Sequence, residues 1–111
     1  MTEIAKAEHI LAGLQAKREA AVARGVVLGE ERTTQAFAAH ADDDAKARKR
    51  LDEINREASL HDSELRSLDA AIAEATKRVA AAQATEARQG ERQRAREILA
   101  AKIFPTNHIS G

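Results

Sequence analysis

Apolar residues recur at alternating intervals of three and four in the second half of the chain. One set of positions is Leu51, Ala58, Leu65, Ile72 and Val79, and the other is Ile54, His61, Leu68, Ala75 and Ala82. Nine of these ten residues are apolar, and the positions between them are rich in charge. Such a heptad pattern, sustained over more than four heptads, is typical of a helix that packs lengthwise on another helix. These ten residues are termed the seam.

The charges between the seam positions are placed as they are on a solvated helix. Three acidic residues stand four residues before a basic one, in the pairs Asp52–Arg56, Asp62–Arg66 and Glu74–Arg78. This acid-first order stabilises a helix more than the reverse order does. The region of the seam is therefore predicted to be helical throughout.

A weaker stripe of the same kind begins near the N-terminus. Thr2 suits a helix N-cap. Apolar residues recur after it at Ile4, Ala7, Leu11 and Leu14. The next positions of that spacing are Arg18, Ala21, Gly25 and Leu28. Because the stripe loses its apolar character there, the pattern predicts a first helix over about residues 2–24.

Two glycines, Gly25 and Gly29, enclose Val26, Val27 and Leu28. Glycine and β-branched residues lower helix propensity, and a glycine commonly follows the last residue of a helix. We therefore expect a turn over about residues 25–29 that reverses the chain and makes a helical hairpin. The alternative is one uninterrupted helix that passes through this weak segment.

Beyond the turn, residues 30–104 contain no proline and are predicted to form one long helix. A break could fall near 42–44, because the three carboxylates of Asp42, Asp43 and Asp44 suit an N-cap and the positive end of a helix. Pro105 disfavours helical geometry at the residue before it, so residues 105–111 are expected to be an irregular tail. The predicted fold class is all-α, an elongated helical hairpin or coiled coil.

The seam is too apolar to stay in water. Burial of its six larger apolar residues would contribute on the order of 10 kcal/mol before the entropy of ordering is subtracted. A first helix of about 22 residues spans only about 33 Å, so it would cover the long helix only to about residue 55. We therefore expect a second copy of the chain to cover the rest, most simply in a two-fold dimer. The helices could run parallel or antiparallel, and antiparallel packing is favoured. All ten seam residues form this predicted interface.

The composition excludes several classes of protein. Tyr, Trp and Cys are absent and Phe occurs twice, which argues against a thick aromatic core and cysteine-based metal sites. The 18 Lys and Arg residues balance 18 Asp and Glu residues, whereas nucleic-acid binders usually carry a basic excess. No apolar run is long enough for a membrane span or a signal peptide. A cytoplasmic protein is expected.

Few residues suggest chemistry of their own. His61 could act as a pH switch within the seam, although an imidazole packed at the rim of the seam is favoured. His40 and Asp44 could bind a metal only with ligands from elsewhere, and the Asp triplet lacks the spacing of a calcium loop. No nucleophile–base set or phosphate-binding loop is present. We expect no enzyme activity, no cofactor and no metal.

A basic stripe lies near the end of the long helix. Arg88, Arg92 and Arg96 recur every fourth residue, with Arg94 and Lys102 nearby. The stripe could contact phosphates. However, acidic residues are interleaved with it and no aromatic is available for base stacking, so a solvated helix face is favoured.

An apolar cluster follows the seam, made of Ile98, Leu99, Ile103 and Phe104. It could close the tip of a helical bundle or dock a partner protein, and closure of the tip is favoured.

The stretch from Ala45 to Ala84, AKARKRLDEINREASLHDSELRSLDAAIAEATKRVAAAQA, covers about a third of the chain. It resembles small coiled-coil proteins of unassigned role in bacterial genomes, some of which are prophage-associated. The resemblance implies a part in phage-type particle assembly, such as that of a scaffold. It transfers no functional residue to this chain.

The sequence therefore favours a non-enzymatic structural or interaction protein, a coiled-coil homo-oligomer that scaffolds or spaces its partners. Two alternatives stay open. One is a nucleic-acid-binding module that uses the Arg88–Lys102 stripe. The other is a regulator that holds a partner protein on its seam, as a helix lies in a groove.

Overall fold

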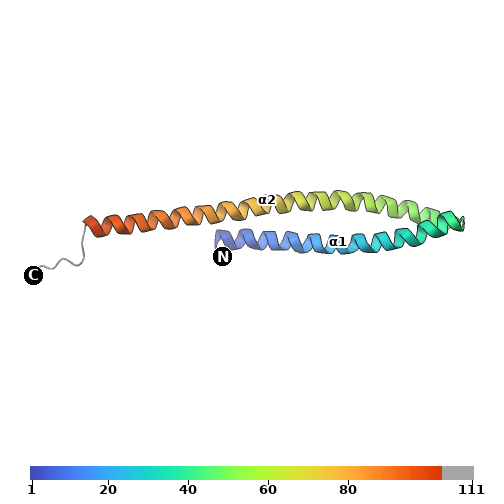
Figure 1. Cartoon of the computed structure of the whole chain (residues 1–111), viewed down its shortest axis with the longest axis horizontal. Coiled ribbons are helices and arrows are strands. Elements are labelled where there is room, and N and C mark those ends of the chain that lie inside the picture. The colour runs from blue at the N-terminus through green and yellow to red at the C-terminus, as the bar shows by residue number, and fades with distance from the viewer. Residues whose placement is uncertain (104–111) are drawn as a thin grey trace, which may run out of the picture.

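The computed structural model describes residues 1–103, which form two helices joined by a short turn. Helix α1 spans Glu3–Ala41 and helix α2 spans Ala45–Ile103. The helices lie side by side and run in opposite directions, so the molecule is a long, narrow hairpin (Figure 1). The predicted all-α, elongated hairpin is confirmed.

The position of the turn differs from the prediction. Helix α1 runs through Gly25 and Gly29 without a break and ends at Ala41. The predicted first helix over residues 2–24 and turn over residues 25–29 are therefore wrong. Each glycine lowers helix stability by only about 1 kcal/mol relative to alanine, and packing against a partner helix outweighs such local preferences.

The chain reverses instead at the three aspartates, where a break near 42–44 was expected as one alternative. Asp43 has a φ of 51°, a left-handed conformation that Asp adopts more readily than most residues. The Asp44 carboxylate accepts hydrogen bonds from the backbone N–H groups of Lys46 and Ala47 at 2.9 and 3.2 Å. Asp44 thus caps the N-terminus of α2, and the single helix predicted over residues 30–104 is divided in two.

The N-terminal end of α1 begins as the sequence predicts. The Thr2 hydroxyl accepts a hydrogen bond from the backbone N–H of Ala5 at 3.0 Å, so the predicted N-cap is confirmed. The tail predicted over residues 105–111, and Phe104 of the apolar cluster, lie outside the described residues.

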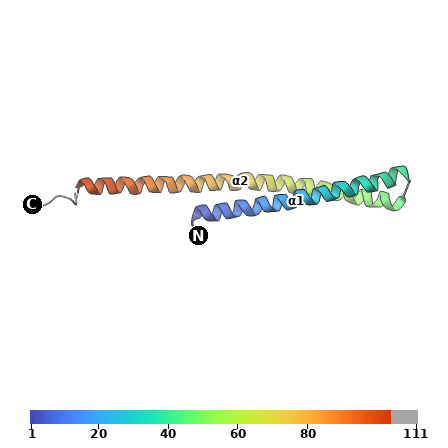
Figure 2. The ribbon, with the colours of Figure 1, turned by 60° about the horizontal axis from the view of Figure 1, so that its bottom comes forward.

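The seam of α2 packs against α1 of the same chain. Leu51, Ile54 and Ala75 are buried, and the other seam residues are half-buried. Buried residues of α1 face them, namely Ala21 and Ala39. In a second view the two helices cross, as they do when they wind about each other (Figure 2). The core is therefore a thin line of small and aliphatic side chains between two helices.

The seam is not too long for its own chain to cover. Helix α1 has 39 residues and spans about 59 Å at 1.5 Å per residue. Its first turn reaches the end of the seam, where Thr2 and Ile4 share a surface hollow with Ala82 and Gln89. The expected mismatch of helix lengths is wrong, because α1 continues for 17 residues beyond the predicted end at residue 24. Burial of the seam requires no second copy.

Within the described residues, the last part of α2 has no helix beside it. Residues 91–102, termed the overhang, are all exposed and extend past the N-terminus of α1 (Figure 1). Neither described helix is long and apolar enough to cross a membrane.

Replacement of the cap residue tests the turn. We expect Asp44→Ala to lower the free energy of unfolding by about 1 kcal/mol, because two backbone N–H groups lose their acceptor. Asp42→Ala is the matched control, since this neighbour stands at the negative C-terminal end of α1 and its loss should cost nothing. Urea denaturation followed by circular dichroism measures both. An equal loss in the two variants would contradict a turn capped by Asp44.

Candidate interaction surface

The two helices pack tightly at Gly25. A Cβ atom built on this residue would lie 2.7 Å from Nε2 of His61, which is closer than van der Waals contact. The same nitrogen is buried and has no hydrogen-bond partner among the described residues. Gly25 therefore provides space in α1 for the imidazole of His61, the one polar seam residue. A larger side chain at position 25 would collide with this imidazole.

Ion pairs on the two sides of the seam are consistent with the same register. Nε of Arg18 lies 2.6 Å from Oδ1 of Asp69, and a nitrogen of Arg24 lies 3.6 Å from Oε1 of Glu64. These residues are about half exposed, so each pair adds little stability. Their value is to favour one alignment of α1 on α2, because a shift by one heptad would separate both pairs.

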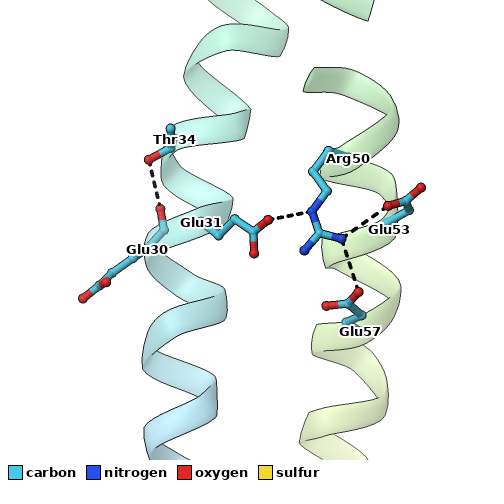
Figure 3. A network of polar contacts seen from close by, with 6 residues as sticks. All are labelled: Glu30, Glu31, Thr34, Arg50, Glu53 and Glu57. Atoms are coloured by element: carbon cyan, nitrogen blue, oxygen red, sulfur yellow. Dashed lines mark hydrogen bonds and ion pairs between the residues drawn. The ribbon is translucent and has the colours of Figure 1, made fainter. Parts of the chain in front are cut away.

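The strongest polar network lies close to the turn and surrounds Arg50 (Figure 3). Nε of Arg50 donates a hydrogen bond to a carboxylate oxygen of Glu31, on the opposite helix, at 2.6 Å. One terminal nitrogen of Arg50 lies 3.3 Å from a carboxylate oxygen of Glu53 and 3.3 Å from one of Glu57. The hydrogen bond from Arg50 holds the pKa of Glu31 below its ordinary value, although partial burial opposes this. The same hydrogen bond raises the pKa of the Arg50 guanidinium, although partial burial acts in the opposite direction.

One of the three predicted ion pairs within α2 forms. Nε of Arg78 lies 2.9 Å from Glu74, and this hydrogen bond lowers the pKa of the Glu74 carboxyl. Asp52 and Asp62 have no ion pair with the basic residue four positions later within the described part of the chain. The helix is therefore held less by these pairs than the sequence indicated.

The candidate metal ligands do not come together. His40 is in the last turn of α1, whereas the Asp44 carboxylate is engaged as the N-cap of α2. Residues 1–103 hold no group of three or more histidine and carboxylate side chains placed to bind a metal ion. The three aspartates instead form the turn between α1 and α2.

The notable surface is one long side of the hairpin, which we term the c/g flank. Counting the seam as heptad positions a and d, positions c and g of both helices project onto this flank. A groove of about 470 Å³ lies on it between the N-terminal half of α1 and the middle of α2. Ala7, Ile10 and Leu14 line it from α1, and Ala71 and Ala75 are among the residues that line it from α2. We term it the Ile10 groove.

A second groove of about 520 Å³ lies on the same flank, nearer the turn. Val27 of α1 and Leu60 of α2 line it and are 62% and 74% exposed. Both occupy position c of their heptads. Glu57 and Glu64 are the acidic residues of its lining. We term it the Leu60 groove, and it presents apolar side chains beside negative charge.

The overhang continues this flank beyond the end of α1. Leu99 occupies position g, on the flank, whereas Ile98 occupies position f, on the outer face of the helix, and they are 57% and 59% exposed. These two residues belong to the apolar cluster predicted at the tip, but no helix closes over them in the described part of the chain. The basic stripe, from Arg88 to Lys102, lies mostly on the overhang and is also exposed.

Ile10, Val27 and Leu60 were not among the candidate residues predicted from the sequence. The signal was present, because large apolar residues at positions c and g interrupt an otherwise charged face. It was overlooked because Val27 was assigned to a turn and Leu60 lies one residue before the seam position of His61.

Alanine substitution of two glycines tests the close approach of the helices. Gly13 has open space around it, so Gly13→Ala should stabilise the helix by about 0.5–1 kcal/mol. Gly25→Ala should instead destabilise the hairpin, because the new methyl group meets His61 and overpacking costs about 1–3 kcal/mol. His61→Ala in the Gly25→Ala background should restore much of the loss. Equal stabilisation by both glycine substitutions would contradict this contact.

The Glu31–Arg50 bond predicts a pH effect. Because the folded-state pKa of Glu31 lies below the ordinary 4.5, the pair stabilises the hairpin above about pH 4.5 and is lost as the pH falls through the lowered pKa. The Tm of Glu31→Gln should therefore be lower than that of the native chain at neutral pH, and the difference should shrink below about pH 4.5. Glu30→Gln, one residue earlier, is the control. A difference that persists in acid would count against the pair.

Comparisons with known proteins assign no family to this chain. No family model matches it, and no curated protein or solved structure does so either. The resemblance to small bacterial coiled-coil proteins therefore stays a prediction, and function must be argued from the hairpin and its c/g flank.

Proposed function

We propose that this protein is a non-enzymatic structural protein, a rigid helical spacer that acts by associating with another helical surface, in the first place its own copies. The observation that carries this proposal is the c/g flank, where exposed apolar residues recur from the turn to the overhang. The proposal keeps the predicted self-association but moves it from the seam, which α1 covers, to the outside of the hairpin.

The magnitude of the exposed apolar surface favours a partner. Full burial of one large aliphatic side chain contributes about 1.5–3 kcal/mol, and four such exposed residues lie on the flank. They are Ile10, Val27, Leu60 and Leu99. Even partial burial would offset part of the entropy lost when two rods associate. Exposed apolar residues that gather on one side of a molecule indicate a candidate site of interaction.

The grooves favour docking over catalysis. They are hollows between two helices. The Ile10 groove is lined mainly by alanine and aliphatic side chains, whereas the Leu60 groove is lined by three aliphatic residues, three charged residues and His61. Catalysis needs a site that excludes water and a set of groups that activate each other. The pattern of these linings is that of a surface on which another helix lies.

The basic overhang keeps nucleic-acid binding as a second candidate. Four basic and two acidic residues occupy residues 91–102, and all of them are exposed. The other alternative, a partner protein held on the seam, would require α1 to leave α2 and is less favoured. The role in phage-type assembly remains what the resemblance implies.

Sedimentation equilibrium of the whole chain at micromolar concentration tests the proposed function. We expect a concentration-dependent dimer, and Leu99→Asp should weaken it by at least about tenfold because a charge would be desolvated in the contact. Phe37→Asp is the matched control, since Phe37 is 69% exposed but occupies heptad position f of α1, off the flank. A monomer at all concentrations would refute self-association.

Filter binding across a salt series separates the second candidate. Phosphate contacts by the overhang would give affinity that falls steeply with salt, whereas a spacer protein should retain no single- or double-stranded nucleic acid at physiological salt. Strong, salt-dependent retention that Arg92→Ala reduces would favour the nucleic-acid candidate.

A further inference from the structure

We propose that two copies of the hairpin pair antiparallel through their c/g flanks, with the overhang of each copy lying in the Leu60 groove of the other. This inference rests on the proposed function and specifies its partner as a second copy of the chain. It accounts for three features at once, namely the two grooves and the uncovered end of α2.

The spacing of the apolar sites along the rod is what a two-fold dimer requires. Leu60 and Leu99 are 39 residues apart on α2, or about 58 Å. The midpoint between them falls next to Val79, within the span of residues 71–82 that lines the Ile10 groove. If the two-fold axis passes through this groove, Leu99 of each copy meets Leu60 of the other. The Ile10 groove then packs on itself.

The three sites also lie on one side of the hairpin. Ile10 and Leu99 occupy position g and Val27 and Leu60 occupy position c, and these positions are neighbours around a helix. A partner rod that contacts one site can therefore contact the others without crossing to a different face. Val22 and Val26 are exposed on the opposite flank, where the overhang presents Arg94, Glu97 and Ala101 and no large apolar residue.

Charge favours the same alignment. Residues 91–102 carry four basic and two acidic residues, a net charge of +2, whereas residues 52–64 carry five acidic and one basic, a net charge of −4. When Leu99 of one copy lies on Leu60 of the other, the antiparallel direction places Lys102 nearest Glu57 and Arg96 nearest Glu64 of the second copy. Both glutamates line the Leu60 groove together with Arg24. Within its own chain Glu57 lies 3.3 Å from Arg50 and Glu64 lies 3.6 Å from Arg24, so the docked basic residues would share these carboxylates. Opposite charges thus meet along the docked segment.

The overhang is suited to this position because it lacks α1. Throughout residues 91–102 the helix is exposed on all sides, so it can approach the Leu60 groove as a third helix. It is about 18 Å long at 1.5 Å per residue. The docked segment would form a local three-helix bundle at each end of the dimer, where the single hairpin has only a thin core.

Disulfide trapping tests this arrangement, since the chain contains no cysteine of its own. Leu60→Cys and Leu99→Cys variants, one of them enlarged by a tag, are mixed in equal amounts and oxidised with glutathione disulfide. We expect the mixed 60–99 disulfide to exceed each of the two symmetric disulfides several-fold. The two copies of position 60 would be about 58 Å apart in the dimer, so the symmetric 60–60 disulfide should not form.

Phe37→Cys is the matched control, because it is exposed at a position off the flank and should form no more mixed disulfide with Leu99→Cys than random collision gives. Charge reversal provides a second measurement, in which Lys102→Glu should weaken the dimer and Glu57→Lys in the same chain should restore it. Helicity by circular dichroism confirms that each variant folds.

The outcomes separate this geometry from the proposed function. A dimer in which the 99–99 disulfide dominates, or in which no 60–99 disulfide forms, overturns the antiparallel pairing while self-association survives. A chain that sediments as a monomer overturns both.

Discussion

The structure depends on the fit of small residues against large ones along a single helix–helix seam. At its centre Gly25 leaves space for His61. Counting from that contact in antiparallel heptad steps places Ala21 of α1 opposite Leu65 and Leu28 opposite Ala58. Such alternation lets two helices approach closely with few large side chains. Because small residues face larger ones at these positions, the fit favours one register for the helices of 39 and 59 residues.

The sequence predicted the class of fold and the seam because a heptad pattern reports directly on helix packing. The seam residues from Leu51 to Ala82 are those that α2 turns toward α1. The position of the turn could not be obtained in the same way. Gly25 was interpreted through its helix propensity, whereas its place in the structure is decided by the imidazole opposite, a contact between residues 36 positions apart. Beyond Leu28 the a and d positions of α1 hold Arg32 and Gln35 before Ala39, so the heptad pattern alone could not show that the helix continues.

The length of α1 decides which surface is left for a partner. A short first helix left the seam uncovered and demanded a second copy, whereas the observed α1 covers the seam and leaves the outer flank to explain. Ile10 and Leu60 are exposed there, and Leu99 extends beyond the hairpin. Within residues 1–102 the two-helix core completely buries one large side chain, Ile54. A rod with so thin a core would gain stability from a further helix that lies on it, as in the proposed pairing of two copies.

A distance measured between the two helices tests the register most directly. Spin labels at Ala16→Cys and Ala70→Cys would stand on opposite outer faces of the hairpin at the same height, both at exposed positions. In a sample diluted with excess unlabelled chain, double electron–electron resonance should give one narrow distance below about 30 Å, which is two helix radii plus the label arms. A turn at residues 25–29 would separate the labels by about 50 Å along the rod. That longer distance, or a short one that vanishes on dilution, would contradict a seam covered by its own chain.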